Sequence, residues 1–196
     1  MAAAAVTIDS DCCLMAVTVS KELHNFTLMK KKTLGIQAHI VANIRPMSVE
    51  DLSQASEVHS KAFARQTLSY EWLQCTLNAF PRMLCYVAIK NETIAGYIVW
   101  SQKSGFRPEA VVELEQIAVL PSLQGKGIGK ILIEQSLQQV RERLYENGSA
   151  LKHVLVTTRA DNHAQSLNKQ VVWAEVEATI TNLYSADEVI MVARNV

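Results

Sequence analysis

Three glycines that alternate with other residues precede an apolar segment of helical periodicity. They are Gly125, Gly127 and Gly129 in the stretch LPSLQGKGIGKIL. A glycine lets the backbone approach another group closely, because it carries no Cβ. The start of a helix also offers free N–H groups and the positive end of the helix dipole, which together attract a diphosphate. The stretch therefore predicts an anion-binding site at the start of a helix.

Two well-known nucleotide-binding signatures fit this stretch poorly. A Walker P-loop needs a glycine where Gln124 stands and a hydroxyl where Ile131 follows Lys130, so the residue that would hold Mg²⁺ is missing. The dinucleotide fingerprint GxGxxG fits at Gly125 and Gly127, but Lys130 takes the place of its third glycine. A turn without a ligand needs one or two glycines rather than three, so an anion-binding role is favoured.

The residues around the glycines resemble the acetyl-CoA-binding segment of the GNAT superfamily of N-acetyltransferases. The signature of that family is Gln or Arg, Gly, any, Gly, any, then Gly or Ala, after a strand that ends in AV-x-P. Here Ala118-Val119-Leu120-Pro121 precedes QGKGIG at residues 124–129. The resemblance covers residues 40–196 in the order of elements. It implies a layered α+β fold: a mixed, mostly antiparallel twisted sheet flanked by helices, in which a splayed pair of strands binds acyl-CoA.

The resemblance assigns the binding of acetyl-CoA, the expected co-substrate, to two groups of residues. The main chains around Ala118, at Ile117 and Val119, would pair with the acyl carbonyl and the pantetheine arm, since an extended, amide-bearing chain can bind a strand edge. The amides of the glycine stretch would hold the pyrophosphate. Its residues are Gln124, Gly125, Lys126, Gly127, Ile128, Gly129 and Lys130. No metal site is expected.

Acetyl transfer to an amine needs a group that accepts the proton of the amine. Glu113 and Glu115 lie two residues apart on a predicted strand, residues 111–120, and so on one face of it. Alignment with the family's strand puts its carboxylate base at Glu113, with Glu115 as the second candidate. The residues alone also allow another interpretation, in which both carboxylates are exposed charges that keep a sheet edge soluble.

The second signature of the family, on a short helix, differs in this chain. The family pattern is Asn-x-x-Ala-x-x-Leu-Tyr, whereas residues 161–168 read DNHAQSLN. Asn162 matches with one residue fewer before the alanine, and Asn168 replaces the tyrosine that usually protonates the leaving thiolate. Asn162 and Asn168 are therefore candidate cofactor contacts, and Tyr184 in the last hairpin is a candidate substitute acid. His163 is expected to face solvent or to cap the helix.

These residues predict an N-acetyltransferase that moves an acetyl group from acetyl-CoA to a primary amine by direct attack. The acceptor stays open between small molecules and peptides. A thiol with a pKa near 8.5 leaves tolerably without a proton donor, so Asn168 is compatible with activity. The alternatives are an acyl-CoA-binding module with little or no transferase activity, suggested by Asn168, and a nucleotide-binding regulatory domain.

The elements that must position these residues follow from hydrophobic periodicity and turn signals. Two helices, one starting at Ser48 and one over residues 69–79 that buries Trp72, should follow a strand at residues 40–45. The further strands are predicted at residues 84–89, 93–101, 111–120, 153–158, 174–183 and 188–195, with helices after the glycines and at residues 164–172. The strand 153–158 reads as buried on both faces. The order β-α-α-β-β-β-α-β-α-β-β excludes a helical bundle and a simple sandwich.

Length and charge limit the classes of protein and partner. The chain has 196 residues, 49% of them hydrophobic, so one large core is expected, in a domain of residues 39–196 after a poorly ordered extension of residues 1–38. Lysine plus arginine and aspartate plus glutamate both number 19, so no basic excess favours nucleic acid as a partner. A homodimer stays open.

The compartment is predicted from the N-terminal stretch and the cysteines. Asp9 and Asp11 interrupt an apolar stretch that no basic segment precedes, so neither a signal peptide nor a membrane span is expected. The four cysteines, Cys12, Cys13, Cys75 and Cys85, form no CxxC pair, and the last two read as small buried apolar residues. A reducing, cytoplasmic location follows as the expectation.

Overall fold

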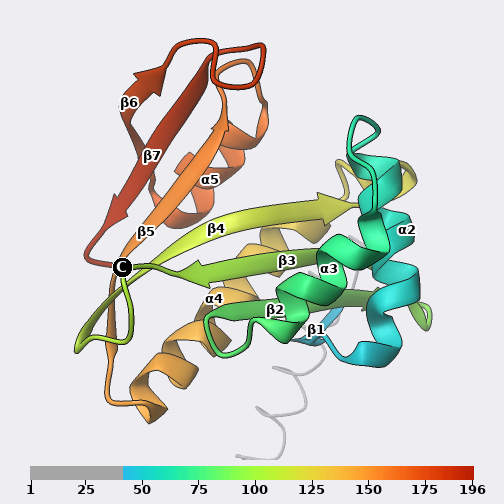
Figure 1. Cartoon of the computed structure of the whole chain (residues 1–196), viewed down its shortest axis with the longest axis horizontal. Coiled ribbons are helices and arrows are strands. Elements are labelled where there is room, and N and C mark those ends of the chain that lie inside the picture. Colours follow the sequence, from blue (N-terminus) through green and yellow to red (C-terminus); the bar gives the residue numbers. More distant parts are fainter. Residues whose placement is uncertain (1–41) are drawn as a thin grey trace, which may run out of the picture. The chain divides into compact units, whose positions relative to one another are not determined.

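Seven strands form one mixed sheet in residues 42–196, the part of the chain that the computed structural model describes (Figure 1). Their order across the sheet is β1-β2-β3-β4-β5-β7-β6. All neighbours run antiparallel except β4 and β5, which are parallel. The mixed, mostly antiparallel α+β architecture is the predicted one. The expectations for residues 1–38, Cys12 and Cys13 among them, lie outside the described residues.

The helices and strands follow the predicted order. They are β1 (Asn43–Pro46), the short 3-10 helix η2 (Val49–Asp51), α2 (Leu52–Ala62), α3 (Ser69–Asn78), β2 (Met83–Lys90), β3 (Thr93–Gln102), β4 (Glu109–Val119), the 3-10 helix η3 (Pro121–Leu123), α4 (Ile128–Glu146), β5 (Ala150–Arg159), α5 (Ala164–Val172), β6 (Glu175–Ile180) and β7 (Glu188–Arg194). None of the helices in this part of the chain is long and apolar enough to cross a membrane.

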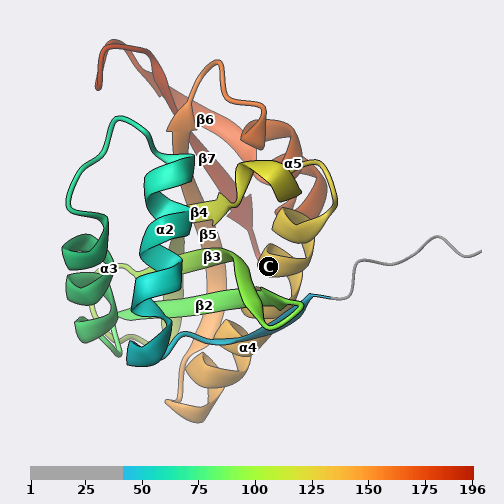
Figure 2. The same ribbon diagram turned by 90° about the vertical axis from the view of Figure 1, so that its right-hand side faces the viewer.

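Helices cover the two faces of the sheet in pairs: α2 and α3 lie on one face, and α4 and α5 on the other (Figure 2). One face of α4 is buried, with Ile133, Leu137, Val140 and Leu144 in the larger apolar cluster. A smaller cluster joins α2 and α3 to β2, β3 and β4. The sheet is therefore the shared wall of two cores, and β3 is buried along nearly all of its length.

Three burial predictions were wrong, because α3 and β5 each pack on one side only. In α3 the inward residues are Leu73 and Thr76, so Trp72 is 49% exposed and Cys75 is exposed as well. In β5 only Val154 and Val156 are buried. The helices α2 and α3 pack against β2, β3 and β4 and leave the second face of β5 partly open to solvent.

The last hairpin forms one edge of the sheet. Each of the six residues of the edge strand β6 is exposed. Tyr184, in the turn between β6 and β7, is 75% exposed. β6 is held by its backbone pairing with β7 and by the ion pair of Arg194 with Glu177 rather than by buried side chains of its own.

Candidate active site

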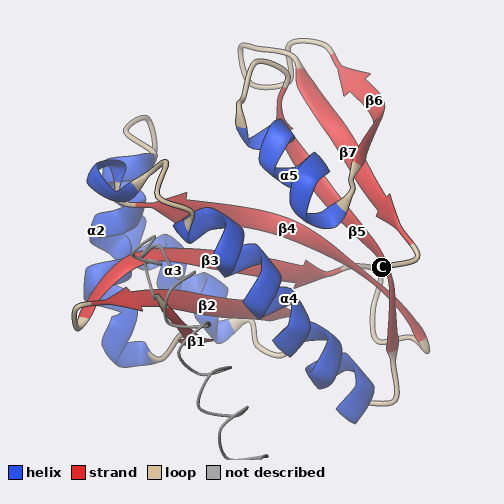
Figure 3. Ribbon diagram, turned by 180° about the vertical axis from the view of Figure 1, so that it is seen from behind, coloured by secondary structure: helices blue, strands red, loops and turns tan. Residues whose placement is uncertain are grey.

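The parallel strands β4 and β5 separate part of the way along their length. Their pairing runs from Glu109 and Ala150 to Leu114 and Val156 and then stops. Beyond that point β4 continues along β3, and β5 continues along β7. Figure 1 and Figure 3, which view the molecule from opposite sides, both show the two strands diverging. The outer edge of β4 over residues 115–119 is thus without a strand partner among residues 42–196.

A β-bulge lies at the point where the two strands separate. Val99 pairs with Gln116, and the next residue, Trp100, pairs with Leu114, so Glu115 is an extra residue on β4. A bulge bends its strand and increases the local twist. Glu115 therefore marks the bend that turns the rest of β4 away from β5.

The main chain of β4 beyond the bulge offers hydrogen-bonding groups on the unpaired side. The N–H of Leu120 donates to the carbonyl of Ala95 at 2.9 Å, which directs residue 120 towards β3. Successive residues of a strand alternate in direction, so the peptide groups of Val119 and Ile117 point away from β3. The side chain of Gln124 donates to the Val119 carbonyl at 3.0 Å. The two residues predicted to pair with pantetheine thus present main-chain groups to the open edge.

The glycine stretch forms a turn of exposed amides at the start of α4. Gly125 and Gly127 have φ angles of +71° and +82°, which side-chain-bearing residues rarely adopt, and a Cβ at either would meet nothing within 4 Å. The N–H of Ile131 donates to the carbonyl of Gly127 at 3.1 Å, the first such bond of the helix. The N–H groups of residues 125–130 have no acceptor among the described residues. A cluster of free donors at a helix N-terminus suits a phosphate group.

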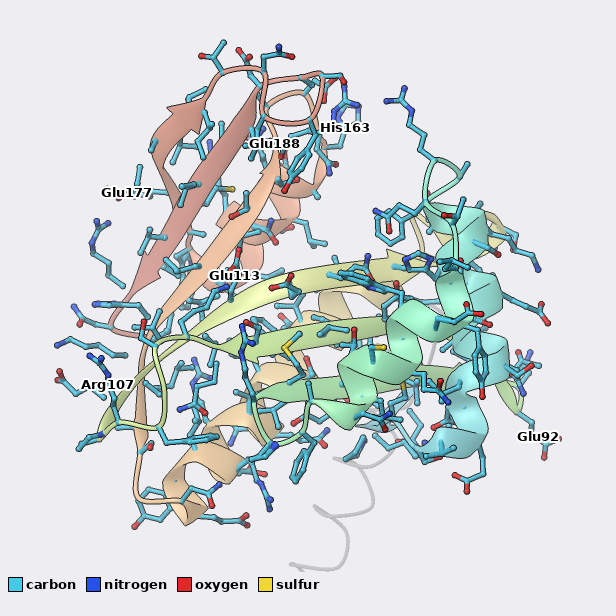
Figure 4. All side chains as sticks on the ribbon, viewed as in Figure 1. Glu92, Arg107, Glu113, His163, Glu177 and Glu188 are labelled. Carbon is cyan, nitrogen blue, oxygen red and sulfur yellow. The ribbon has the colours of Figure 1, made fainter. Side chains whose placement is uncertain are left out.

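The two candidate carboxylates have different surroundings. Glu113, in the last part of β4 that pairs with β5 (Figure 4), accepts a hydrogen bond from the Thr157 hydroxyl at 2.9 Å and forms an ion pair with Lys103. The Lys103 nitrogen lies 4.0 Å from the nearest carboxylate oxygen of Glu115. The side chain of Glu113 is 15% exposed and that of Glu115 is 36% exposed. Glu115 is therefore the freer proton acceptor of the two.

Helix α5 gives its asparagines separate roles. Asn162 caps the helix: its oxygen accepts the N–H of Ala164 at 2.9 Å, and its nitrogen donates to the Thr158 hydroxyl at 3.0 Å. His163 faces solvent, as predicted (Figure 4). Asn168 is only 3% exposed, and its side-chain amide makes no hydrogen bond within residues 42–196. Its amide atoms are not fully enclosed, since the Ser101 hydroxyl is the one fully buried side-chain polar atom without a partner in this part of the chain.

Two aromatic residues near this site point to solvent. Trp173 ends α5 in the left-handed conformation, with φ of 54°, where helices usually place a glycine, and it is 78% exposed. The hydroxyl of Tyr184 makes no hydrogen bond to a described residue. Tyr184 is therefore not held towards β4 by any hydrogen bond within the described residues. Within the described residues there is also no group of three or more side chains suited to bind a metal.

The sequence reasoning missed a buried polar cluster beside the bulge. Gln116, the first residue after the bulge, lies between the hydroxyl of Tyr97 and the imidazole of His59. Tyr97 and His59 are both fully buried. A signal existed: His59 follows Leu52 and Ala55 at helical spacing, which places one polar residue on the apolar face of the predicted helix.

Comparisons with known proteins agree with this geometry. The family model described as "Acetyltransferase (GNAT) family" matches residues 48–168, which is more than half of the chain. A search of curated protein sequences gave no significant match.

Solved structures resemble the chain in fold at low sequence identity. The ribosomal-protein-S18-alanine N-acetyltransferase of Escherichia coli is 21% identical, with a TM-score of 0.61 over 79% of this chain and 94% of that one. An acetyltransferase of Bacillus subtilis in complex with CoA is 19% identical, with a TM-score of 0.60 over 80% and 100%. An aminoglycoside 6'-acetyltransferase type Ii is 14% identical, with a TM-score of 0.63 over 79% and 97%. With its family match and its fold in agreement, the chain belongs to the GNAT family of acetyltransferases.

Proposed function

We propose that this protein transfers the acetyl group of acetyl-CoA to a primary amine by direct attack. The feature that supports this function best is the order of two sites along β4: an unpaired strand edge, followed directly by a turn of free amides. Acetyl-CoA has the same order, because its acyl group and extended pantetheine arm come first and its pyrophosphate follows. The names of two similar enzymes, which specify an alanine and an aminoglycoside as acceptors, agree with an amine acceptor.

The donor would bind along the open edge as an additional strand. The amides of pantetheine can pair with the outward peptide groups of Ile117 and Val119. The carbonyl of Val119, which already accepts from Gln124, retains a second lone pair for this pairing. The pyrophosphate would accept hydrogen bonds from the amides of residues 125–130, where the dipole of the 19-residue helix α4 adds attraction.

The transfer itself needs few groups from the protein. The nitrogen of the neutral amine attacks the thioester carbon, the C–N bond forms, and the C–S bond breaks with its electron pair leaving on sulfur. Negative charge that develops on the carbonyl oxygen can be stabilised by an outward N–H of β4, at Ile117 or Val119. The proton that the nitrogen loses must pass to a base.

Glu115 is the better candidate for that base, although the family alignment favours Glu113. Both oxygens of Glu113 already have a partner, Thr157 at one and Lys103 at the other. An amine that approaches Glu113 must therefore displace one of these two partners. Glu115 lies on the bulge itself, at the start of the unpaired edge, and has only a distant lysine.

Asn168 would assist the departure of the thiolate without protonating it. Its amide, which has no hydrogen-bond partner among the described residues, can donate to sulfur, whereas the tyrosine common at this position can also give up a proton. This residue is also what favours the second candidate function, an acyl-CoA-binding module. The two functions differ in turnover, and both require acetyl-CoA to bind.

The test combines binding with turnover. Acetyl-CoA should raise the melting temperature, and ATP or NAD at equal concentration should not. Thiol release is then measured with a panel of alanine-, serine- and methionine-initiated peptides, lysine, spermidine and kanamycin. Stabilisation by acetyl-CoA without thiol release from any amine would favour the binding module, and equal stabilisation by ATP or NAD would contradict both functions.

Two matched variants then test the base. With the best amine of the panel, Glu115→Gln should lower turnover by roughly 10²-fold or more at unchanged acetyl-CoA affinity. Glu113→Gln should have a smaller effect, because its two contacts are structural. A larger loss in Glu113→Gln than in Glu115→Gln would return the role of base to Glu113.

A further inference from the structure

A buried chain of polar side chains links helix α2 to the segment of β4 next to the open edge. The hydroxyl of Tyr97 donates to the Gln116 side-chain oxygen at 2.6 Å. The Gln116 nitrogen lies 3.4 Å from Nε2 of His59, and Nδ1 of His59 lies 2.9 Å from the Ser69 hydroxyl. The imidazole also stacks on the ring of Tyr97, with centroids 6.4 Å apart and 20° between the planes. Buried polar groups joined in this way hold a single arrangement.

The donors and acceptors in this series of hydrogen bonds fit only a neutral His59. Burial raises the pKa of Tyr97, so its hydroxyl stays protonated and donates. The Gln116 amide therefore turns its N–H groups to His59, whose Nε2 must accept and whose proton lies on Nδ1, facing Ser69. Burial lowers the pKa of His59, which favours this neutral form, although the side chain of Gln66 acts in the opposite direction.

The same imidazole ring holds two separate parts of the molecule. Through Nε2 it reaches Gln116, the residue between the bulge at Glu115 and the outward-facing Ile117. Through Nδ1 it reaches the first residue of α3 and so ties together the ends of the exposed loop of residues 63–68. Within residues 42–196 no strand pairs with β4 on its open side, and these side-chain contacts fasten the segment to α2 together with the apolar cluster that includes Ala118.

We propose that His59 and Gln116 are positioning residues that couple loop 63–68 to the acetyl-CoA segment of β4. The inference rests on the proposed function, because it requires acetyl-CoA to pair with residues 117 and 119. A ligand that orders this edge restrains Gln116, then His59, then the Ser69 end of the loop. Coupling of this kind is reciprocal, so a contact that orders the loop strengthens the hold on acetyl-CoA.

Hydrogen–deuterium exchange of the full chain, with and without saturating acetyl-CoA, tests this coupling. In the wild-type protein acetyl-CoA should slow exchange in peptides that cover residues 63–70 by about fivefold or more. Ser69→Ala should bind acetyl-CoA as the wild type does and lose this response, because the link is cut at the loop. Ser69→Thr keeps the hydroxyl and should restore it. Gln116→Met, which cuts the link at β4, should also lose the response.

A serine that takes no part in these hydrogen bonds provides the control. The Ser60 hydroxyl lies on α2 next to His59, and within residues 42–196 its one hydrogen bond is to the carbonyl of Glu57, so Ser60→Ala should respond as the wild type does. Binding of acetyl-CoA by the wild type without slower exchange in residues 63–70 would overturn the coupling and leave the proposed function standing. A normal response in both Ser69→Ala and Gln116→Met would do the same. Absence of acetyl-CoA binding would overturn the proposed function together with the coupling.

Discussion

Gly127 offers the sharpest test of the anion site. It is the last residue before α4, its φ angle is +82°, and its added side chain would enter open space among the free amides of residues 125–130. Gly127→Glu places a carboxylate where the pyrophosphate of acetyl-CoA would lie. Gly127→Gln places a neutral side chain of nearly the same shape there, so the pair separates charge from bulk.

The size of the charge effect follows from distance. A carboxylate about 5 Å from a phosphate charge, at an effective dielectric constant of about 20, costs about 3 kcal/mol per pair of unit charges. Gly127→Glu should therefore bind acetyl-CoA on the order of 100-fold more weakly than Gly127→Gln. Either side chain must adopt the left-handed conformation, which lowers the free energy of unfolding by about 1–2 kcal/mol in both variants.

Isothermal titration calorimetry with acetyl-CoA measures the affinities, and thermal melting measures the shared conformational cost. The control is Gly105→Glu in the loop between β3 and β4, where φ is +84° and a Cβ again meets nothing within 4 Å. It should melt lower and bind acetyl-CoA normally. The difference between the two Gly127 variants should shrink in high salt, because exposed charges are screened. Equal affinities of Gly127→Glu and Gly127→Gln in low salt would refute an anion at this turn.

Three further predictions concern stability. Gly96→Ala should lower the free energy of unfolding by about 1–3 kcal/mol in urea, because its Cβ would lie 2.6 Å from the Ala118 carbonyl oxygen; an unchanged urea midpoint would contradict this contact. Trp173→Gly should raise the free energy of unfolding by about 1 kcal/mol and with it the melting temperature, because glycine relieves the left-handed backbone strain and the exposed indole buries little apolar surface. A lower melting temperature would show that the indole has a packing role. Burial lowers the pKa of His59, so the contribution of this residue to the free energy of unfolding should be complete above about pH 6.5 and should fall as the pH drops from there towards the folded-state pKa. The free energy of unfolding of His59→Asn should therefore depend less on pH between pH 5 and 8. An equal pH dependence in both proteins would exclude His59 as the cause.

The elements and the glycine turn before α4 could be predicted because their signals are local. The β2–β3 hairpin has two β-rich runs around a polar turn, and Asn91 and Glu92 in that turn take the positive φ angles that tight hairpins need. The inner face of α4 repeats at helical spacing, and Gly125 and Gly127 mark the turn before it. Each of these patterns lies within a stretch of a few residues.

The details of the catalytic groups depend on contacts between distant parts of the chain. The bulge at Glu115 exists only in the register of β4 against β3, which the sequence of β4 alone does not contain. Thr157, which occupies an oxygen of Glu113, comes from β5, and His59, which reaches Gln116, comes from α2. Asn162, a predicted cofactor contact from the motif, also accepts the N–H of Ala164 at the start of α5, and that prediction stays a prediction. Residue types indicate which side chains could take part in catalysis. The pairing of distant elements decides which of these side chains have no other hydrogen-bond partner.

The exposed edge strand β6 has a consequence for how this protein can change over generations. Each of its six side chains faces solvent, so most substitutions there should alter the free energy of unfolding by no more than about 0.5 kcal/mol. In β3, where nine of ten residues are buried, a single truncation can cost several times as much. β6 can therefore accumulate new side chains almost independently of stability, whereas β3 and the buried residues of β7 cannot. Sequence variation among proteins of this fold is expected to gather on this edge strand, one strand away from positions where the same change would unfold the domain.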